Sequence, residues 1–542
     1  MQWRKHFPFK GGARENQANA IEFAIRSFVS GKRFVILEAA TGVGKSAIGL
    51  TVARWLNEFL PEEEESAYKP GAYFMTTQKI LQEQYMKDFG EERGGTMRQL
   101  MSSSNYTCKF HKKQTCAESL RMLKIENDKE SKFYRCCSFG CVYKEEKRKF
   151  IDHRESLTNF AYFLAETYYA GKLEPRSLLV IDEAHNADLE LCGFVEISFS
   201  ERFAKTALKI DMPEISTQLQ SINWVVQSYL PKLRDHVKHY EDTIEKFNLG
   251  EKLESNFANI AKQYEMLDKH ICKVNRFLEI YDHENWVFNL VEGEGSGMRK
   301  IEFKPIDVSP YSDSILFNKG RRVLMMSATI LNHEGFCEML GIKDEDSSFI
   351  SIPSPFPPEN HPIIAAPVAR MTANNIDADL PKLAEAIRSI LESHSDVKGI
   401  IHTHSYKVAK YLRENIKDKR LLFHGAEDRL EKLSKHMNSK EPTVLVSPSM
   451  QEGVDLKDDL SRFQIICKVP YPYLGDKIVK KRMNRWKWWY PLQTAKTIVQ
   501  SIGRSVRSST DHATSYILDA DWERFYSKHS HLFPDTFQKS LK

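Results

Sequence analysis

Short runs of apolar and β-branched residues recur along the chain, separated by stretches whose apolar residues have helical spacing. The runs lie at residues 34–37, 71–77, 177–182, 323–329, 399–405, 443–449, 465–470 and 515–519. Strands with continuous apolar runs are buried on both faces, and strands that alternate with helices form parallel sheets. The pattern therefore predicts an α/β protein built on parallel sheets.

Two stretches interrupt this alternation. Residues 96–150 are polar and rich in cysteine, whereas residues 203–310 are mainly helical in pattern. Apolar residues recur there every three or four positions on both sides of a turn sequence at 248–250, namely at Leu233, Val237, Tyr240, Ile244 and Phe247, and at Phe257, Ile260, Tyr264, Leu267, Ile271, Val274 and Leu278. This pattern predicts an antiparallel helical hairpin. Residues 286–291 and 300–308 predict a β-hairpin that closes the segment.

The composition limits the function classes. The chain has 542 residues, 41 % hydrophobic and 28 % charged, which excludes a disordered chain and fits several folded domains. Its 78 Lys and Arg against 73 Asp and Glu give a net charge of +5, so no general polyanion-binding character is evident. Residues 1–12 lack the apolar run of a secretory signal, and no run reaches the about 18 apolar residues of a membrane span. We therefore expect an intracellular protein that is not in a membrane.

Five of the nine cysteines fall within 34 residues: Cys108, Cys116, Cys136, Cys137 and Cys141. The surrounding residues 108–155 contain 13 Lys and Arg against 8 Asp and Glu, an excess equal to the net charge of the whole chain. Thiols stay reduced inside cells, where clustered cysteines indicate a metal site. Four thiolates suit either a [4Fe-4S] cluster or a Zn²⁺ ion, and the residues alone favour Zn²⁺ because structural zinc sites with four cysteines are common.

A phosphate-binding loop is indicated between the first predicted strand and the helical pattern that follows it. The sequence there is Ala40-Thr41-Gly42-Val43-Gly44-Lys45-Ser46, with Ala39 where the general pattern has glycine. Backbone N–H groups of such a loop surround phosphates, the lysine reaches the β- and γ-phosphates, and the hydroxyl binds Mg²⁺. We therefore expect ATP and Mg²⁺ at this loop.

Two further groups fit the same chemistry. Asp182 and Glu183 end the predicted strand 177–182, at the sheet edge where ligands of parallel sheets bind. There an Asp can hold Mg²⁺ and a Glu can orient or deprotonate the attacking water. Far along the chain, Gln500, Arg504 and Arg507 would share one face of a helix, and arginines so placed can neutralise γ-phosphate charge from across a cleft.

In this order the motifs resemble those of superfamily 2 helicases. Arg14 and Gln17 match the adenine-reading motif of these helicases, and Asp455 matches a nucleotide-binding position. The other matching positions are Thr76, Thr77 and Gln84, and residues 182–185, 327–329, 401–405, 452–455 and 500–507. The cysteines before residue 182, the helical insertion after it and the phrase Val469-Pro470-Tyr471-Pro472 resemble the XPD/DinG group, as do residues 158–162.

The resemblance implies two RecA-like motor domains, the first interrupted by a small iron–sulfur domain and a mainly helical arch domain. The expected boundaries are 1–95, 151–202 and 311–333 for motor domain 1, 96–150 for the iron–sulfur domain, 203–310 for the arch and 334–542 for motor domain 2. The implied activity is that of an ATP-dependent DNA helicase that moves 5′ to 3′ on single-stranded DNA. Its implied substrate is forked DNA, and its implied role is in DNA repair. We expect a monomer.

Alternatives remain at three places in the chain and for the function. In this family context we favour a [4Fe-4S] cluster over Zn²⁺, held by Cys108, Cys116, Cys137 and Cys141, with Cys136 as the alternative third ligand. The basic, aromatic residues of this domain either contact DNA or form a solvated face: Lys109, Lys112, Lys113, Lys144, Lys147, Arg148, Lys149, Phe133, Tyr134, Phe139 and Tyr143. Residues 480–490 are either a DNA platform or an anchor of the next helix. An RNA-stimulated ATPase or a translocase without strand separation is the alternative function.

Overall fold

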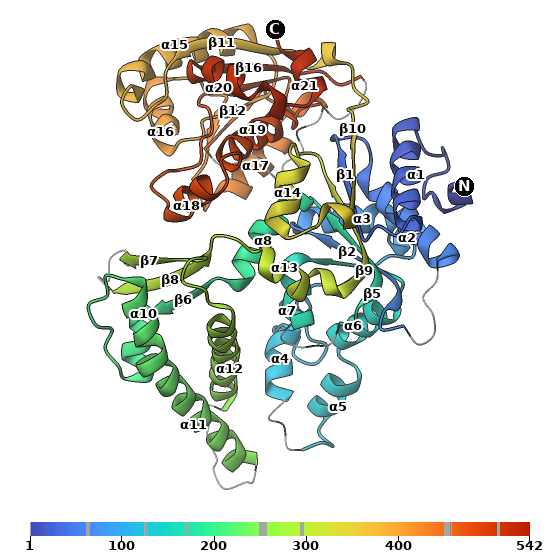
Figure 1. The fold of residues 1–542 in the computed structure, drawn as a ribbon, viewed down its shortest axis with the longest axis vertical. Helices are drawn as coiled ribbons and strands as arrows, with labels where there is room; N and C mark the ends of the chain where they lie inside the picture. The colour runs from blue at the N-terminus through green and yellow to red at the C-terminus, as the bar shows by residue number, and fades with distance from the viewer. Residues whose placement is uncertain are drawn as a thin grey trace.

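The protein is described from a computed structural model, which covers residues 2–60, 66–123, 126, 128–168, 171, 173–248, 257–292, 298–425, 427–448, 456, 458–506 and 510–542. Two parallel sheets form separate domains that face each other, and two smaller domains extend from the first (Figure 1). The predicted α/β class with two RecA-like domains is confirmed. No helix in the described ranges is long and apolar enough to cross a membrane.

Motor domain 1 is built on a seven-stranded sheet in the order β10-β1-β9-β5-β2-β4-β3, and the pairs within it are parallel. Its strands are β1 (Phe34–Ala39), β2 (Lys69–Thr76), β3 (Arg98–Gln99), β4 (Glu155–Asn159), β5 (Arg176–Asp182), β9 (Gly320–Ser327) and β10 (Ser347–Ile352). Its helices are α1 (Glu15–Val29), α2 (Lys45–Phe59), α3 (Lys79–Phe89), α7 (Phe160–Tyr168), α8 (Ala187–Val195), α13 (Ser309–Ile315) and α14 (His333–Leu340).

The two faces of this sheet bury different cores. Along β1, Phe34 and Ile36 belong to one apolar cluster, whereas Val35 and Leu37 belong to the other, which also contains the inner faces of α1 and α2. Alternate side chains of a strand point to opposite faces, so both faces of a central strand must be apolar. This is why the strand appears in the sequence as an unbroken apolar run.

Two strands lie outside the boundaries that we expected from the sequence. We placed the start of motor domain 2 at residue 334, but β10 pairs with β1 from Phe34↔Ser347 to Ala39↔Ile352. The chain therefore returns to the first sheet before it crosses over. Similarly, β6 (Ile197–Ser200) pairs with β8 (Arg299–Pro305) in the arch, ahead of the expected boundary at residue 203.

Motor domain 2 contains a six-stranded parallel sheet in the order β11-β16-β15-β12-β14-β13. The strands are β11 (Ile363–Ala369), β12 (Gly399–His402), β13 (Leu421–Phe423), β14 (Val444–Ser447), β15 (Phe463–Ile466) and β16 (Thr514–Asp519). The helices are α15 (Ile376–Ser393), α16 (Tyr406–Asn415), α17 (Arg429–Asn438), α18 (Lys477–Arg485), α19 (Trp489–Ile502), α20 (Asp521–His529) and α21 (Asp535–Ser540).

The cysteine-rich domain holds three short helices, α4 (Cys116–Leu123), α5 (Lys132–Phe139) and α6 (Val142–Asp152), and it hangs below the first sheet (Figure 1). The arch beside it contains β6, α9 (Glu201–Phe203), α10 (Gln218–Trp224), the long pair α11 (Leu230–Asn248) and α12 (Phe257–Ile280), then β7 (Trp286–Glu292) and β8. β7 and β8 pair antiparallel. The predicted helical hairpin and β-hairpin are thus confirmed, and the turn sequence at 249–250 lies outside the described residues.

Candidate active site

A cavity of about 950 Å³ lies between the two motor domains. Because the strands of each sheet are parallel, the loops that follow β1, β5 and β9 reach it from the same sheet edge. Its lining includes the predicted residues Ala40, Thr41, Gly42, Gly44, Lys45, Ser46, Asp182, Glu183, Gln500 and Arg504. The structure therefore brings together groups that are more than 400 residues apart in the chain.

Left-handed glycines shape the loop between β1 and α2. Gly42 has φ 80° and Gly44 has φ 88°, a region that side-chain-bearing residues rarely adopt. A Cβ at Gly44 would lie 2.6 Å from Gln17 Nε2. With Gly44 as the N-cap, α2 begins at Lys45, so the first N–H groups of the helix face the cleft. Lys45 Nζ lies 3.5 Å from the carbonyl oxygen of Ala39 at the base of the loop.

Arg14 and Gln17, which we matched to an adenine-reading motif, lie behind this loop. The Arg14 guanidinium donates to the carbonyl oxygens of Gly42 at 2.8 Å and Val43 at 3.0 Å. Gln17 Oε1 accepts the backbone N–H of Arg14. Arg14 and Val43 also border a separate cavity of about 200 Å³ beside the loop, together with Glu15, Asn16 and Pro355. Both side chains therefore brace the loop, and the small cavity is the adjoining space.

The acidic pair stands at the carboxyl end of β5. Asp182 is buried and accepts a 2.9 Å hydrogen bond from the hydroxyl of Tyr85, a residue of α3 that the sequence did not single out. Burial and the neighbouring Glu183 carboxylate raise the pKa of Asp182, while Lys45 acts in the opposite direction. Glu183 has φ 52°, so the turn that carries it is strained. Strain of this kind, held at a sheet edge in a cleft, is typical of functional positions.

His185 connects this turn to both motor domains. Its Nδ1 lies 2.7 Å from Ser327 Oγ, at the end of β9, and its Nε2 lies 2.8 Å from Gln500 Nε2, on α19. Since an amide nitrogen donates, the Nε2 of His185 accepts and the proton sits on Nδ1. Gln500 also donates to Thr329 Oγ1 at 3.2 Å. A continuous chain of hydrogen bonds therefore joins residues 182–185, residues 327–329 and Gln500.

The predicted helix across Gln500, Arg504 and Arg507 is shorter than we expected. α19 ends at Ile502, where Gly503 caps it by donating its N–H to Val499 O, and Arg504 follows in a turn that lines the cleft. The glycine and the serine-rich residues after it favour a helix end, so helical spacing was wrong for Arg504. Arg507 and Asp455 both lie outside the described residues.

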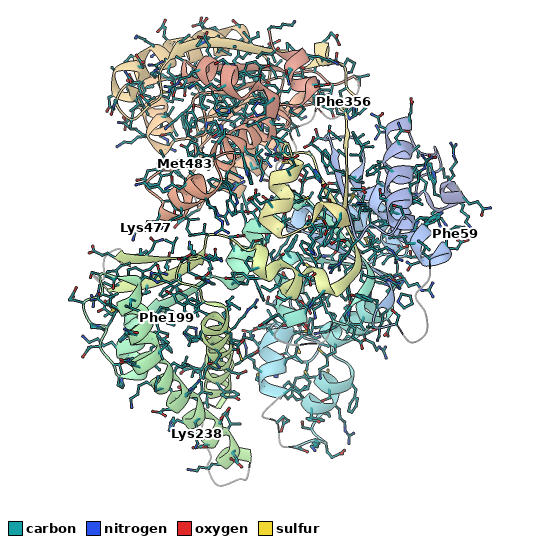
Figure 2. All side chains as sticks on the ribbon, viewed as in Figure 1. Phe59, Phe199, Lys238, Phe356, Lys477 and Met483 are labelled. Carbon is teal, nitrogen blue, oxygen red and sulfur yellow. The ribbon has the colours of Figure 1, made fainter. Side chains whose placement is uncertain are left out.

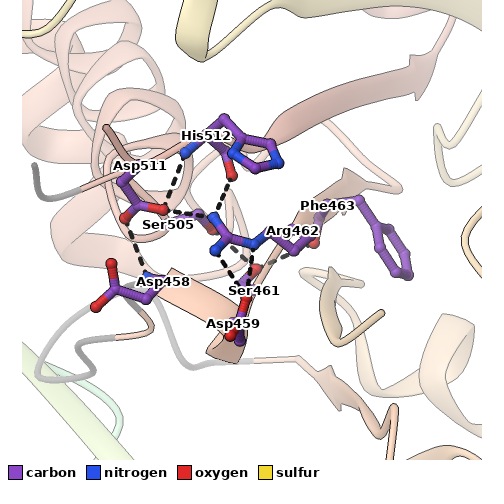
Figure 3. Close-up of polar contacts among 8 residues, drawn as sticks. All are labelled: Asp458, Asp459, Ser461, Arg462, Phe463, Ser505, Asp511 and His512. Carbon is purple, nitrogen blue, oxygen red and sulfur yellow. Dashed lines mark hydrogen bonds and ion pairs between the residues drawn. The ribbon is translucent and has the colours of Figure 1, made fainter. Parts of the chain in front are cut away.

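A polar network missed by sequence reasoning supports the Arg504 turn. Arg462 forms ion pairs with Asp459 at 2.8 Å and with the fully buried carboxylate of Asp511 at 2.7 Å (Figure 3). Asp511 also accepts the backbone N–H of Asp458, which lines the cleft. Ser505, next to Arg504, bonds to Ser461 Oγ. In the sequence, the available signal was Asp511, an isolated acidic residue that follows a run of serines and belongs to no local motif.

Glu38 is a second residue that sequence reasoning missed. It is buried at the end of β1, accepts the backbone N–H of Leu331 and the hydroxyl of Ser351, and lines the cleft. Burial raises the pKa of this carboxyl. Leu331 has φ 60°, a strained conformation. Glu38 therefore holds this residue, which follows residues 327–329, against β1, the strand before the phosphate loop. A lone glutamate within an apolar strand was the available signal.

Four of the five clustered cysteines, Cys108, Cys116, Cys137 and Cys141, are buried together, whereas Cys136 is half-exposed. The sulfurs of Cys108 and Cys137 are 3.9 Å apart. Burial and the neighbouring thiol of Cys108 raise the pKa of Cys137 to about 12. Within the described ranges, no three His, Cys, Asp or Glu side chains are arranged as a ready metal site.

The basic, aromatic surface of this domain is smaller than the sequence indicated. Tyr143 is buried and its hydroxyl bonds to that of Tyr162, and Lys147 pairs with Glu166. Both are therefore removed from the expected surface because their polar atoms are used inside the protein. Phe139 is 86 % exposed, and Lys109, Lys112, Lys113, Lys144 and Arg148 are exposed as well.

Residues 480–490 anchor motor domain 2 to its neighbours. The buried Arg482 of α18 donates to Asp188 at 3.0 Å, to Ile306 O at 2.9 Å and to Cys192 Sγ at 2.9 Å. Trp486 and Trp489 are buried too. The two tryptophans are therefore buried, as the anchor interpretation expects, but the hydrogen bonds of Arg482 to Asp188 and Cys192 join it to motor domain 1 and not to the next helix. Lys480, Lys481 and Lys487 stay exposed.

A second set of contacts extends this junction to the arch and α14. Arg485 pairs with Asp307, and Lys477 donates to the backbone oxygen of Phe288 in β7. Trp486 Nε1 donates to Glu338 in α14 at 2.8 Å. Figure 2 shows Lys477 and Met483 on the side of motor domain 2 that faces the arch.

The fold consists of two parallel RecA-like sheets. One carries the phosphate loop and the acidic pair at a strand end, and the other places a Gln and an Arg opposite them. This arrangement is that of a two-domain motor of the superfamily 2 helicase type. Two family models match: "Type III restriction enzyme, res subunit" at residues 10–212 and "Helicase C-terminal domain" at residues 387–540. The chain is 26 % identical over 258 residues to the ATP-dependent DNA helicase DinG of Photobacterium profundum, covering 43 % of this chain and 36 % of that protein.

DinG of Escherichia coli K12 is 22 % identical over 483 residues, 71 % of this chain and 66 % of that protein. The chain thus spans less than two thirds of these curated relatives. A solved XPD helicase superposes with a TM-score of 0.62 at 17 % identity, covering 96 % of this chain and 98 % of that one, and S. tokodaii Xpd4 gives 0.59 at 16 %, covering 98 % and 99 %. These structures share the fold. Together, the two family models, the DinG relatives and the shared fold support an XPD/DinG-like superfamily 2 helicase.

Proposed function

We propose that this chain is an ATP-driven DNA helicase, acting as a monomer, that translocates 5′ to 3′ on single-stranded DNA and unwinds forked duplexes. The observation that carries the proposal is the cavity between the two motor domains, with Lys45 and Glu183 on one wall and Gln500 and Arg504 on the other. A cleft of this kind changes its closure with the state of the nucleotide, which is what drives a two-domain motor.

On the wall formed by motor domain 1, the loop N–H groups and Lys45 bind the phosphates, and Ser46 and Asp182 are the proposed Mg²⁺ ligands. Bound Mg²⁺ would neutralise charge on the β- and γ-phosphates. Glu183 orients and deprotonates the attacking water, because its carboxylate stands at the end of β5 beside Asp182. Adenine would lie toward Arg14 and Gln17, beside the cavity of about 200 Å³ that Arg14 borders.

On the wall formed by motor domain 2, Arg504 neutralises charge that develops on the γ-phosphate, and Arg507 and Asp455 are proposed partners by their place in the motifs. Arg504→Ala should lower turnover by about 10³- to 10⁵-fold while ATP still binds. Equal loss of binding and turnover would remove Arg504 from this role. The same assay applies to Arg507→Ala.

The cysteine-rich domain is the proposed site of strand contact near the fork. Its support is the exposed ring of Phe139 and the exposed lysines of the same domain, groups that bind single strands by stacking and by phosphate contacts. Phe139→Ala should weaken binding of a fluorescent oligonucleotide by about 1–3 kcal/mol. The control is Tyr406→Ala, which removes an aromatic ring of 60 % exposure from α16. An equal effect of both substitutions would contradict the assignment.

A [4Fe-4S] cluster is the proposed cofactor of this domain, with Zn²⁺ as the alternative. The donor set fits by its chemistry: Cys108, Cys116, Cys137 and Cys141 supply four buried thiols that belong to one continuous apolar cluster. A bound cluster would join the segments that carry these residues. The chain itself contributes the burial that excludes water from the sulfurs, and Tyr143 and Phe150 belong to the same apolar cluster.

One experiment tests most of the proposal. Purified protein with measured iron and zinc is given matched duplexes with a 5′ or a 3′ overhang, and ATP turnover is followed with single-stranded DNA or RNA. We expect iron, unwinding from the 5′ overhang and stronger stimulation by DNA, all lost in Lys45→Ala except the iron. Unwinding from the 3′ overhang alone reverses the polarity. Stimulation by RNA alone, or turnover without strand separation, favours the alternative function.

A further inference from the structure

A buried lysine of α19 holds the main chain of the acidic turn from the other motor domain. Lys496 is 8 % exposed, and its Nζ donates to the carbonyl oxygen of His185 at 2.9 Å. Gln500, one helical turn further on, reaches the ring of the same residue at 2.8 Å. α19 therefore holds His185 at two points, at its backbone and at its side chain.

The position of this contact connects it to the chemistry. His185 belongs to the single turn Ala184–Asn186, and the residue before that turn is Glu183, with φ 52°. A hydrogen bond to the His185 carbonyl therefore fixes the peptide between His185 and Asn186, within the single turn that follows the strained glutamate. A buried ammonium is costly unless it is hydrogen-bonded, so Lys496 favours the arrangement in which the two motor domains are in contact.

We propose that Lys496 is a positioning residue that makes the geometry of Glu183 depend on contact between the motor domains. The inference rests on the proposed ATPase function and deepens it, because it assigns a second contact through which α19 reports domain closure to the acidic turn. Gln500 acts on the His185 ring, whereas Lys496 acts on the backbone. Turnover, more than ATP binding, should therefore depend on Lys496.

The test compares K496M, K496Q and K496R with K528M, which removes an exposed lysine from α20. Steady-state ATP hydrolysis is measured with and without single-stranded DNA, and melting temperature reports folding. Loss of a charged hydrogen bond predicts that DNA-stimulated kcat falls about 10- to 100-fold in K496M and K496Q while KM for ATP stays within about twofold. K496R, which keeps a cationic donor, should recover part of the loss, and K528M should match the unchanged protein.

A second readout is independent of hydrolysis. Dyes at the exposed positions Arg26 in α1 and Lys382 in α15 report the distance between the motor domains by energy transfer as a non-hydrolysable ATP analogue is added. At saturating analogue, the ratio of closed to open protein should be about tenfold lower in K496M and K496Q than in the unchanged protein. Folded variants with unchanged stimulation and unchanged closure overturn the inference. If the unmodified protein is stimulated by no nucleic acid, the proposed function fails instead, and the closure measurement alone decides the role of Lys496.

Discussion

The buried ion pair between α18 and α8 should control how firmly motor domain 2 is held to motor domain 1. Both side chains are almost fully buried, with Arg482 4 % and Asp188 5 % exposed, and they are 294 positions apart in the chain. Burial alone would lower the pKa of Arg482, but neighbouring Cys192 and Asp188 raise it, so the guanidinium stays charged. Arg482→Met would leave the Asp188 carboxylate buried without its counter-charge.

The magnitude follows from that geometry. Removing one partner of a buried ion pair costs about 3–5 kcal/mol, because the remaining charge is uncompensated. At about 1.4 kcal/mol for each tenfold change, local opening of α18 becomes about 10²- to about 4 × 10³-fold more frequent. Native-state hydrogen exchange measures it directly through the amides of Lys480 and Trp486, which bond within α18 to Asp476 and Arg482.

A double-mutant cycle distinguishes the pair from a general loss of packing. Asp188→Asn combined with Arg482→Met should cost at least about 2 kcal/mol less than the sum of the two single changes. The control is Lys432→Met on α17, whose partly exposed pair with Asp428 should contribute less than about 1 kcal/mol. Exchange in α18 that changes less than tenfold in Arg482→Met, or strictly additive effects, would refute the reasoning.

Three other predictions follow from the described side chains. Gly44→Ala places a Cβ at φ 88° and 2.6 Å from a neighbouring amide, so binding of a fluorescent ATP analogue should weaken at least tenfold while the melting temperature changes little; unchanged binding contradicts the loop geometry. Cys137→Ser should abolish bound metal and Cys136→Ser should leave it, as measured by elemental analysis, and the reverse result exchanges the two cysteines. Burial lowers the pKa of His270 to about 4 from 6.5, so the unfolded arch binds this proton more tightly, and stability that is present above about pH 6.5 is lost as the pH falls toward 4. At pH 5 about 2 kcal/mol of stability is lost, which is measured as faster hydrogen exchange in α12 after correction for intrinsic rates. His270→Gln should remove this pH dependence.

The sequence was sufficient for the parts of the fold that depend on local pattern. Central strands such as β1 and β5 carry apolar side chains on both faces, and that requirement is visible as an unbroken run. The long helices α11 and α12 are visible because their packing repeats every three or four residues. The phosphate loop is visible because its glycines and Lys45 are adjacent in the chain.

Elements whose identity depends on distant partners were not predicted. β10 has a mixed burial pattern and becomes a strand of the first sheet through its pairing with β1, more than 300 positions earlier. β13 has only three residues, and β11 contains a proline. The basic charge of residues 480–490 gave no indication that Arg482 is buried, because its carboxylate partner lies in another domain.

The same limit applies to the site, where the catalytic motifs are local but the groups that position them are not. Lys496 and Gln500 on α19 contact the turn after β5, while Arg482 on the preceding helix contacts α8, the helix that continues from that same turn. Trp486, which follows α18, and Trp489 of α19 are buried in one apolar cluster with Met339 of α14, so α18 and α19 are packed together there. We therefore expect a displacement of motor domain 2 that breaks the contacts of α19 to strain the contacts of α18 as well. The α18 contacts reach the base of the arch through Asp307 and Phe288. This pair of helices therefore connects the cleft to the arch. We expect a substitution of Arg482 to change the geometry of Glu183, although the two residues belong to different motor domains.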